Sequence, residues 1–221
     1  MSDSVHCPLC DNGTTELFYR DRRRPYRRCS RCELVFVPPA YYLDRDAEKA
    51  EYDLHDNQVD DPGYRRFLSR LAGPLLERLP LNARGLDFGC GPGPALAAML
   101  EEAGHSVALY DVFYAPDSTV LECDYDFICA TEVVEHLHRP GAELARLWQC
   151  LRPDGWLGVM TKLVRDREAF AGWHYKNDPT HVCFYSEATW RWWAAQQGAL
   201  LEFIGADVML LHKPVGSAPG P

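Results

Sequence analysis

The sequence predicts an α/β fold: a doubly wound, mostly parallel sheet with a final antiparallel strand, preceded by a small zinc ribbon. Three observations support this prediction. Two CxxC pairs near the start are separated by 18 residues, and short apolar segments from residue 84 onward alternate between strand and helix patterns. A tight turn at residues 205–207 joins the last two apolar segments, so those two strands should be antiparallel. The length of 221 residues suits one ordinary domain plus a small module.

Composition and charge exclude several classes of protein. Hydrophobic residues make up 47% of the chain, too many for a disordered chain. The longest apolar runs are about five residues, far short of a membrane span. The first ten residues, MSDSVHCPLC, lack the basic and apolar regions of a secretory signal. We therefore expect a cytoplasmic protein with no membrane insertion. The net charge of −9 argues against a protein-wide basic field for nucleic acid.

The chain divides into four predicted segments: a zinc ribbon at 1–37, an acidic connector at 38–61, an α/β domain at 62–213 and a flexible tail at 214–221. The connector carries eight acidic residues against two basic ones between residues 44 and 61. The tail reads PVGSAPGP, a composition with little to bury.

The CxxC pairs contain Cys7, Cys10, Cys29 and Cys32. Four thiolates at this spacing suit a tetrahedral structural Zn²⁺, and a segment with little core needs such a cross-link. The alternative is a ribbon without metal. The chain has nine cysteines, an odd number, and a reducing compartment disfavours disulfides. The other five are expected to be small buried hydrophobes: Cys90, Cys123, Cys129, Cys150 and Cys183.

Between the two CxxC pairs lies a run of arginines: Arg20, Arg22, Arg23, Arg24, Arg27, Arg28 and Arg31. Residues 1–37 contain these seven arginines and five acids, a formal charge of +2. A Zn²⁺ held by four thiolates contributes about −2, so the loaded module is near neutral. Two interpretations stay open: a solvated surface that balances the thiolates, or a contact with an anionic substrate or partner.

The elements of the α/β domain follow in order. Apolar residues at helical spacing between Tyr64 and Leu79 predict a first helix, which Gly73-Pro74 is expected to interrupt. Beyond it, the pattern predicts strands at 85–88, 106–110, 126–130, 156–161, 200–204 and 208–211. Helices are predicted at 94–103, 141–151 and 186–197, with Ser186 as the N-cap and Gly198 as the stop of the last one.

A glycine-rich loop follows the first strand. Gly89, Gly91 and Gly93 alternate between the strand and the next helix, where glycine lets the backbone turn tightly and approach a ligand. The loop lacks the Lys-Ser/Thr of a phosphate-binding P-loop. Asp87 would repel a pyrophosphate and would favour a cationic ligand. Asp111 ends the second strand, where an acid can accept both ribose hydroxyls of a nucleoside.

Together, Asp87, the glycines and Asp111 resemble the first two motifs of class I S-adenosylmethionine-dependent methyltransferases. Two later segments resemble motifs of the ubiquinone-biosynthesis-like group of these methyltransferases: residues 130–140, ATEVVEHLHRP, and residues 151–161, LRPDGWLGVMT. The resemblance covers residues 84–165. It implies a Rossmann-like sheet and an S-adenosylmethionine site formed by Asp87, Gly89, Cys90, Gly91, Gly93, Asp111, Thr131 and Glu132.

The chain departs from that family between Asp111 and Asp126. Only 14 residues lie there, where the family usually has a helix and a third strand. We expect the helix to be lost and residues 118–121 to form a reduced strand. Cys123 or Asp124 are candidates to replace the usual contacts with adenine.

Three histidines are candidate catalytic residues: His136, His174 and His181. His136 follows the fourth strand, and the other two lie in a polar, aromatic segment after the fifth, where substrate loops occur. Each could act as a base or an orienting donor, and each could equally be structural. A metal site of His174, Asp178 and His181 is a weaker alternative.

The resemblance implies transfer of a methyl group to an acceptor that the sequence does not identify. A small molecule is favoured by the acidic charge. RNA stays an alternative because the order of modules resembles that of rRNA guanine methyltransferases, and protein is a third. A non-catalytic binding module with a degenerate fold is the alternative from a different class.

Overall fold

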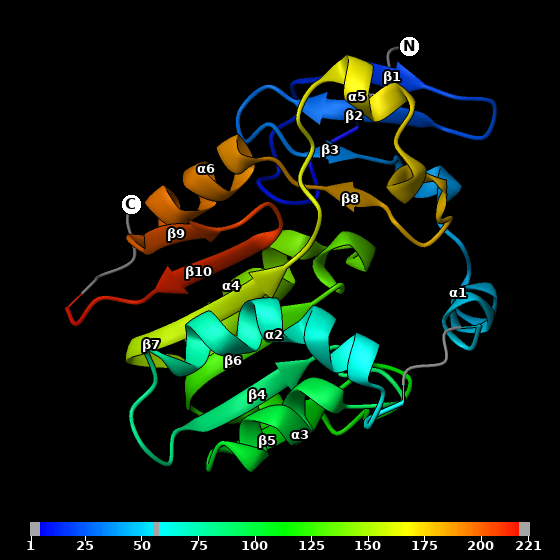
Figure 1. Cartoon of the computed structure of the whole chain (residues 1–221). Coiled ribbons are helices and arrows are strands. Elements are labelled where there is room, and N and C mark those ends of the chain that lie inside the picture. The colour runs from blue at the N-terminus through cyan, green and yellow to red at the C-terminus, as the bar shows by residue number, and fades with distance from the viewer. Residues whose placement is uncertain (1–4, 55–57, 217–221) are drawn as a thin grey trace.

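The computed structural model describes residues 5–54 and 58–216, and it contains two sheets (Figure 1). The smaller sheet is antiparallel, with the order β1-β2-β3-β8. Its strands are β1 (Thr15–Arg20), β2 (Pro25–Cys29), β3 (Val35–Phe36) and β8 (Cys183–Phe184). The last strand comes from the C-terminal part of the chain, so a distant segment completes the sheet that the cysteine-rich region begins.

The larger sheet has the order β5-β4-β6-β7-β10-β9. Its strands are β4 (Arg84–Phe88), β5 (Ser106–Tyr110), β6 (Tyr125–Thr131), β7 (Leu151–Met160), β9 (Leu200–Ile204) and β10 (Val208–His212). The pairs β4–β5, β4–β6 and β6–β7 are parallel, whereas β10 is antiparallel to both of its neighbours. The predicted fold class is therefore confirmed.

Helices cover both faces of this sheet, as alternate residues of β6 show. Phe127 and Cys129 pack in one cluster with α2 (Pro62–Leu76) and α3 (Ala95–Glu102). Ile128 and Ala130 point the other way, into a cluster with α4 (Pro140–Cys150) and α6 (Glu187–Gln197). Figure 1 shows α2 in front of the sheet and α4 behind it. This second cluster also contains the buried side chains of the small sheet, so the two sheets share one core.

Several local predictions can be compared with the structure. Ser186 caps α6 in a capping box with Thr189, and Gly198 ends the helix at a φ of 63°, as expected. The helix α2 continues through Pro74 to Leu76, so the expected interruption was wrong: a proline in the last turn loses its own backbone hydrogen bond but leaves the preceding turns intact. Residues 118–121 are not a strand: Ser118–Glu122 form a 3₁₀ helix. The predicted reduced strand was wrong.

The acidic stretch contains the 3₁₀ helix Pro39–Tyr41 and the helix α1 (Arg45–Tyr52), which Asp44 caps. Further short helices are Val134–His136, α5 (Arg167–Ala171) and His174–Asn177. Residues 55–57 of the predicted connector and 217–221 of the predicted tail lie outside the described residues. Within the described part of the chain, no helix combines the length and apolarity needed to cross a bilayer.

Candidate active site

The glycine loop is held against the end of β5. The backbone N–H of Gly89 donates to the carbonyl oxygen of Tyr110 at 2.8 Å. Gly89 has a φ of 76°, and a Cβ there would lie 2.3 Å from a methyl group of Val133. Both the conformation and the space therefore require glycine. The N–H of Gly91 donates to Oδ2 of Asp111 at 3.1 Å, which ties the loop to the next strand.

Asp111 also organises the turn that follows β5. Its Oδ1 accepts from the backbone N–H groups of Phe113 and Tyr114 at 2.8 and 3.1 Å. Each carboxylate oxygen keeps further lone-pair capacity, so Asp111 can still accept from ligand hydroxyls. Asp87 lies deeper, at 2% exposure, and its Oδ1 has no hydrogen-bond partner among the described residues. Burial, followed by the charge of Asp111, raises the pKa of Asp87 to about 7.

A cavity of about 700 Å³ extends from this loop into the space under α1. Nine residues predicted from the sequence line it together: Gly89, Cys90, Gly91, Asp111, Thr131, Glu132, His136, His174 and His181. Asp87 and Gly93 are not part of its lining. Asp87 is buried behind the wall, and the carbonyl of Gly93 accepts from Ala95 at the start of α3.

Helix α1 forms a wall of the cavity that the sequence analysis did not predict. Glu48 and Tyr52 line the cavity one helical turn apart, and the Tyr52 hydroxyl donates to Glu48 at 2.8 Å. The Tyr52 ring packs edge-on against His136, with 5.2 Å between centroids. Arg45 lies over the ring of Phe113 and donates to the Val112 carbonyl. The acidic composition had suggested a connector, and only the i, i+4 spacing of Glu48 and Tyr52 gave a local sign of a shared face.

Two carboxyl groups meet at the Tyr175 hydroxyl. This hydroxyl hydrogen-bonds to Glu135 and lies 3.4 Å from Oε2 of Glu132 and 3.2 Å from the Thr161 hydroxyl. Glu132 has a φ of 50°, a strained conformation for this residue. Burial raises the pKa of both glutamates, so protons are held here at pH values where exposed carboxyls are ionised. Tyr175 is thus a site residue that the sequence analysis missed.

Two of the predicted histidines lie side by side. The rings of His136 and His181 are 4.6 Å apart. Nδ1 of His181 lies 2.7 Å from the Tyr175 carbonyl oxygen, which can only accept, so Nδ1 carries the proton and neutral His181 has its lone pair on Nε2. Nε2 lies 3.7 Å from Oδ2 of Asp178. Burial lowers the pKa of His181, which keeps it neutral and able to accept a proton.

His174 is placed differently. It is exposed at the edge of the cavity, and its Nε2 lies 3.3 Å from the Nζ of Lys162. An ammonium group only donates, so this contact occupies the lone pair that a base would use. The structure therefore separates His174 from the pair formed by His136 and His181.

The ligand atoms of Glu135, His136 and His181 lie within 4.8 Å of one another. This set could hold a divalent cation, since carboxylate and imidazole groups are common ligands. It differs from the weaker prediction of a site at His174, Asp178 and His181.

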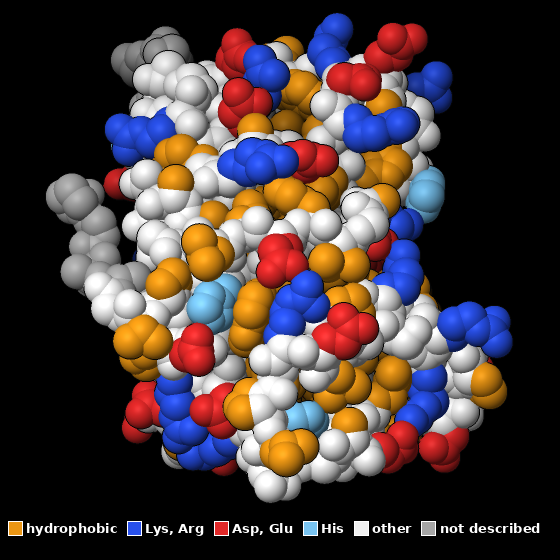
Figure 2. All heavy atoms as spheres, turned by 60° about the vertical axis from the view of Figure 1, so that its left-hand side comes forward, with side chains coloured by type: hydrophobic (Ala, Val, Ile, Leu, Met, Phe, Trp, Pro, Cys, Tyr) orange, Lys and Arg blue, Asp and Glu red, His pale blue; other side chains and the backbone are white. Residues whose placement is uncertain are grey.

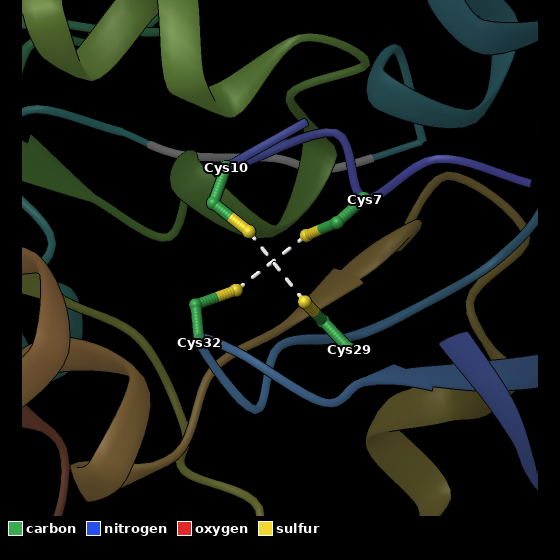
Figure 3. A group of neighbouring side chains, drawn as sticks. All are labelled: Cys7, Cys10, Cys29 and Cys32. Carbon is green, nitrogen blue, oxygen red and sulfur yellow. Dashed lines mark hydrogen bonds between the residues drawn. The ribbon is translucent and has the colours of Figure 1, made fainter. Parts of the chain in front are cut away.

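The four N-terminal cysteines form the second such group. Their sulfurs lie within 4.8 Å of one another and face a common centre (Figure 3). The Cys7–Cys32 and Cys10–Cys29 sulfur distances are both 3.5 Å. A tetrahedron with Zn–S bonds of about 2.3 Å has sulfurs about 3.8 Å apart. The donor set therefore fits Zn²⁺. None of the nine cysteines forms a disulfide, and four of the five outside this group are buried, with Cys123 partly exposed.

The seven arginines of the run differ in their surroundings, and four of them are exposed: Arg20, Arg22, Arg23 and Arg31. Arg24 is buried, Arg27 donates to Thr15, and Arg28 pairs with Glu16. On the face seen in Figure 2, basic and acidic side chains are interspersed and do not form a large basic patch. Several arginine N–H donors are therefore already used within the protein, which weakens the alternative that this run contacts an anionic substrate or partner.

A family model described as a methyltransferase domain matches residues 55–201. The structure is similar to a Burkholderia thailandensis 1,6-didemethyltoxoflavin-N1-methyltransferase with bound 1,6-didemethyltoxoflavin and S-adenosylhomocysteine. The two are 20% identical, with a TM-score of 0.56 over 90% of this chain and 99% of that chain. An O-methyltransferase family protein from the same organism is 14% identical, with a TM-score of 0.48 over 79% of this chain and 61% of that chain.

A comparison with curated proteins found no match. The structural likeness supports the fold, and the family model covers well over half of the chain. The chain therefore belongs to the methyltransferase-domain family, as an S-adenosylmethionine-dependent methyltransferase.

Proposed function

We propose that this methyltransferase acts on a small-molecule acceptor, bound between α1 and the histidine pair. The observation that carries this proposal is the cavity itself. One continuous cavity joins the Asp111 end, where a nucleoside fits, to His136 and His181, where a proton can be accepted. A volume of about 700 Å³ is in the range of small-ligand sites.

The cofactor side would bind S-adenosylmethionine, which supplies an electrophilic methyl group. Asp111 would accept from the ribose hydroxyls, and the glycine loop lets the backbone approach closely. The carboxyl group of Asp87, buried behind this side, and that of Glu132, where the two sides of the cavity meet, favour the positive charges of the cofactor. Phe113 and Tyr114, not Cys123 or Asp124, line the cavity after Asp111, so we assign the adenine side to them.

On the acceptor side, His181 would take a proton from an acceptor hydroxyl or N–H through Nε2. Its Nδ1–H bond to the Tyr175 carbonyl fixes the ring and its tautomer, and Asp178 stabilises the positive charge that develops. His136 would contact the acceptor beside it. His174 stays a candidate for orienting the acceptor at the edge of the cavity. The protein's main contribution is alignment of the reacting atoms and exclusion of water.

The charges around the cavity favour a neutral or cationic acceptor. Five acidic residues line it, against the two basic residues Arg139 and Lys162; the acids are Glu48, Asp111, Glu132, Glu143 and Asp178. A polyanion such as RNA would be repelled by this set. The arginine run, which was the main argument for RNA, is partly engaged within the protein, because Arg24 is buried, Arg27 donates to Thr15 and Arg28 pairs with Glu16. RNA and protein acceptors therefore become the alternatives that an experiment should exclude.

We further propose that the four cysteines hold a structural Zn²⁺, so that residues 5–37 form a zinc ribbon. At the second group, a divalent cation on Glu135, His136 and His181 is the alternative to base catalysis by His181. Such an ion would lower the pKa of a bound hydroxyl. Rate dependence on added Mg²⁺ or Mn²⁺, measured with the zinc ribbon loaded, distinguishes the two.

The test is transfer of labelled methyl from S-adenosylmethionine into a cell extract separated into small-molecule, RNA and protein fractions. Label in the small-molecule fraction, lost in the His181→Asn variant, is expected. Label confined to RNA or to protein would overturn the proposed acceptor class. Failure of the wild-type protein to bind S-adenosylmethionine in calorimetry would overturn the cofactor assignment and favour the binding-module alternative.

A further inference from the structure

Arg24 connects the cysteine-rich module, which we define as residues 5–37, to the acceptor side of the cavity. Its side chain is 6% exposed. The guanidinium donates to the carbonyl oxygens of Lys176, Asp178 and Pro179 at 2.9, 2.7 and 2.9 Å, and its Nε donates to the Tyr26 hydroxyl at 3.1 Å. A rigid planar fork with five donors is suited to holding several carbonyls at fixed positions.

The held turn lies in the middle of the segment 174–181. This segment supplies Tyr175, Asp178 and His181 to the cavity wall. Arg23, beside Arg24, adds a bond of 2.9 Å to the Asn177 carbonyl. The backbone positions that set where His181 and Asp178 point are therefore bonded to side chains of the N-terminal hairpin. Loss of Arg24 would remove the shortest of these bonds from each carbonyl: the Lys176 carbonyl would keep only the Tyr26 hydroxyl at 3.2 Å, and the Asp178 carbonyl only the His181 N–H at 3.3 Å.

A second connection passes through the backbone of Val182. Its carbonyl accepts from the Val37 N–H at 2.9 Å, at the end of the cysteine-rich module. Its own N–H donates to the Glu135 carbonyl at 2.8 Å. One residue thus bridges the module to the segment that carries Glu135 and His136. The neighbouring pairing of β3 with β8 supports the same contact.

A third connection lies at the first CxxC turn. The N–H of Gly141 donates to the Pro8 carbonyl at 3.2 Å, and a Cβ at Gly141 would lie only 2.4 Å from the Leu9 carbonyl oxygen. Gly141 is at the start of α4, directly after the segment 132–139. The module therefore contacts the segment that carries His181 and the start of α4, directly after the segment that carries His136. The glycine loop, by contrast, is fastened to Tyr110 and Asp111 of the large sheet.

We propose that Arg24 is a positioning residue of the acceptor site, and that the cysteine-rich module braces the acceptor wall while leaving the cofactor loop independent of it. The catalytic meaning of this brace rests on the proposed function, but the brace itself can be tested without an acceptor. The tests use hydrogen exchange measured by mass spectrometry on the full-length, zinc-loaded protein.

The main variant is Arg24→Met, with Arg24→Lys as the conservative variant and Arg22→Ala as the matched control. Arg22 is an exposed arginine of the same hairpin. In Arg24→Met we expect exchange in peptides covering 174–182 to accelerate about tenfold or more, because loss of the three guanidinium bonds favours local opening of this turn. Peptides covering 86–114 should change less than about twofold, and the calorimetric Kd for S-adenosylmethionine less than about threefold. Arg24→Lys should be intermediate, because one ammonium group cannot span three carbonyls.

Wild-type exchange rates at 174–182 in Arg24→Met would overturn the proposal, as would equal acceleration at 86–114, which would indicate general destabilisation. If Arg24→Met does not fold, Arg24→Lys gives the same two comparisons. Removal of zinc with a chelator provides a separate test, in which exchange should rise at 132–139 and 174–182 together. These outcomes are distinguishable from failure of the proposed function, because they require no methyl transfer.

Discussion

The cofactor side and the acceptor side of the cavity are built in different ways. The cofactor side comes from one stretch of chain, residues 87–114, in which a strand, a glycine-rich loop, the helix α3 and a second strand place Gly89, Gly91 and Asp111 together. The acceptor side is assembled from α1, from residues 131–138, from Lys162 and from residues 174–181, with the cysteine-rich module behind them.

This difference separates two kinds of constraint. On the cofactor side, backbone conformation and backbone hydrogen bonds fix the geometry, so a few residue types are required at fixed spacing. On the acceptor side, the geometry depends on long-range contacts such as Arg24 to the 176–179 backbone. Changes on the first side should affect cofactor affinity, and changes on the second should affect turnover at unchanged cofactor affinity.

The largest expected effect is on the acceptor side. His181→Asn removes the Nε2 lone pair, and the rate of methyl transfer to a protonated acceptor should fall by about 10²–10⁴-fold. The Kd for S-adenosylmethionine should stay within about threefold of wild type. Turnover and calorimetry on the same preparation check both numbers. His212→Asn is the matched control, because His212 lies on β10 and outside the cavity lining, and it should retain wild-type turnover. A parallel loss of cofactor affinity in His181→Asn would contradict the division into two sides.

On the cofactor side, Gly89→Ala should weaken S-adenosylmethionine binding by about 100-fold. The new Cβ would meet Val133 at 2.3 Å and would force the loop away from Tyr110. Gly205→Ala is the control. Gly205 also has a positive φ, 64°, but a Cβ added there would have no atom of the described part of the chain within 4 Å, so the variant carries the backbone strain without the collision. If Gly89→Ala and Gly205→Ala bound S-adenosylmethionine with equal affinity, the close contact between position 89 and Val133 would not determine cofactor binding.

The same difference explains what the sequence could and could not predict. The strand, glycine loop and Asp111 were recognisable because local spacing determines their geometry, and the six-strand sheet followed from alternating patterns. Tyr52 and Glu48 were missed because a run of acids resembles a solvated connector when the partner surface is unknown. Tyr175 was missed because the role of its hydroxyl depends on contacts with Glu132 and Glu135, which lie more than 35 residues away in the chain.

The arginine run is a further case in which contacts with distant residues could not be predicted from the sequence. Formal charge suggested solvent or an anion as its environment, whereas Arg24 is buried against backbone carbonyls that lie more than 150 residues away. The reduced strand at 118–121 was wrong for a local reason. Asp117 caps Ser118–Glu122 by accepting from the Thr119 N–H, which favours a helical turn over an extended edge strand.

A smaller effect is expected for Asp111→Asn, about a tenfold loss in affinity for S-adenosylmethionine. The amide has one acceptor oxygen where the carboxylate has two, so the bonds to Gly91 and to the 113–114 turn compete with those to the ribose. Turnover at saturating cofactor should change little, which calorimetry and initial rates can establish together. Asp117→Asn, at the exposed cap of the 3₁₀ helix, is the control. A fall in turnover without any change in affinity for S-adenosylmethionine would show that Asp111 acts on the acceptor side of the cavity.

The smallest effect is a proton released when the cofactor binds. In the free protein the pKa of Asp87 is about 7, raised by burial, so this carboxyl is partly protonated at neutral pH. A bound cation favours the carboxylate and lowers this pKa, so binding should release up to about one proton near pH 7 and should tighten as the pH rises through 7. Calorimetry in two buffers of different ionisation enthalpy measures the release.

The free energy of unfolding depends on pH in the opposite direction to the affinity for the cofactor. The folded free protein holds the Asp87 proton up to about pH 7, whereas the unfolded chain loses it near 3.8. Between these values the folded state binds more protons, so the free energy of unfolding contributed by Asp87 falls as the pH rises, and the effect levels off above pH 7. Asp87→Asn should remove this slope from thermal unfolding and reduce the proton release. Glu135→Gln, on the acceptor side, should leave the release on cofactor binding intact. If instead Glu135→Gln abolishes the release, the two sides share one titrating network through Glu132 and Tyr175, and their independence fails at that point.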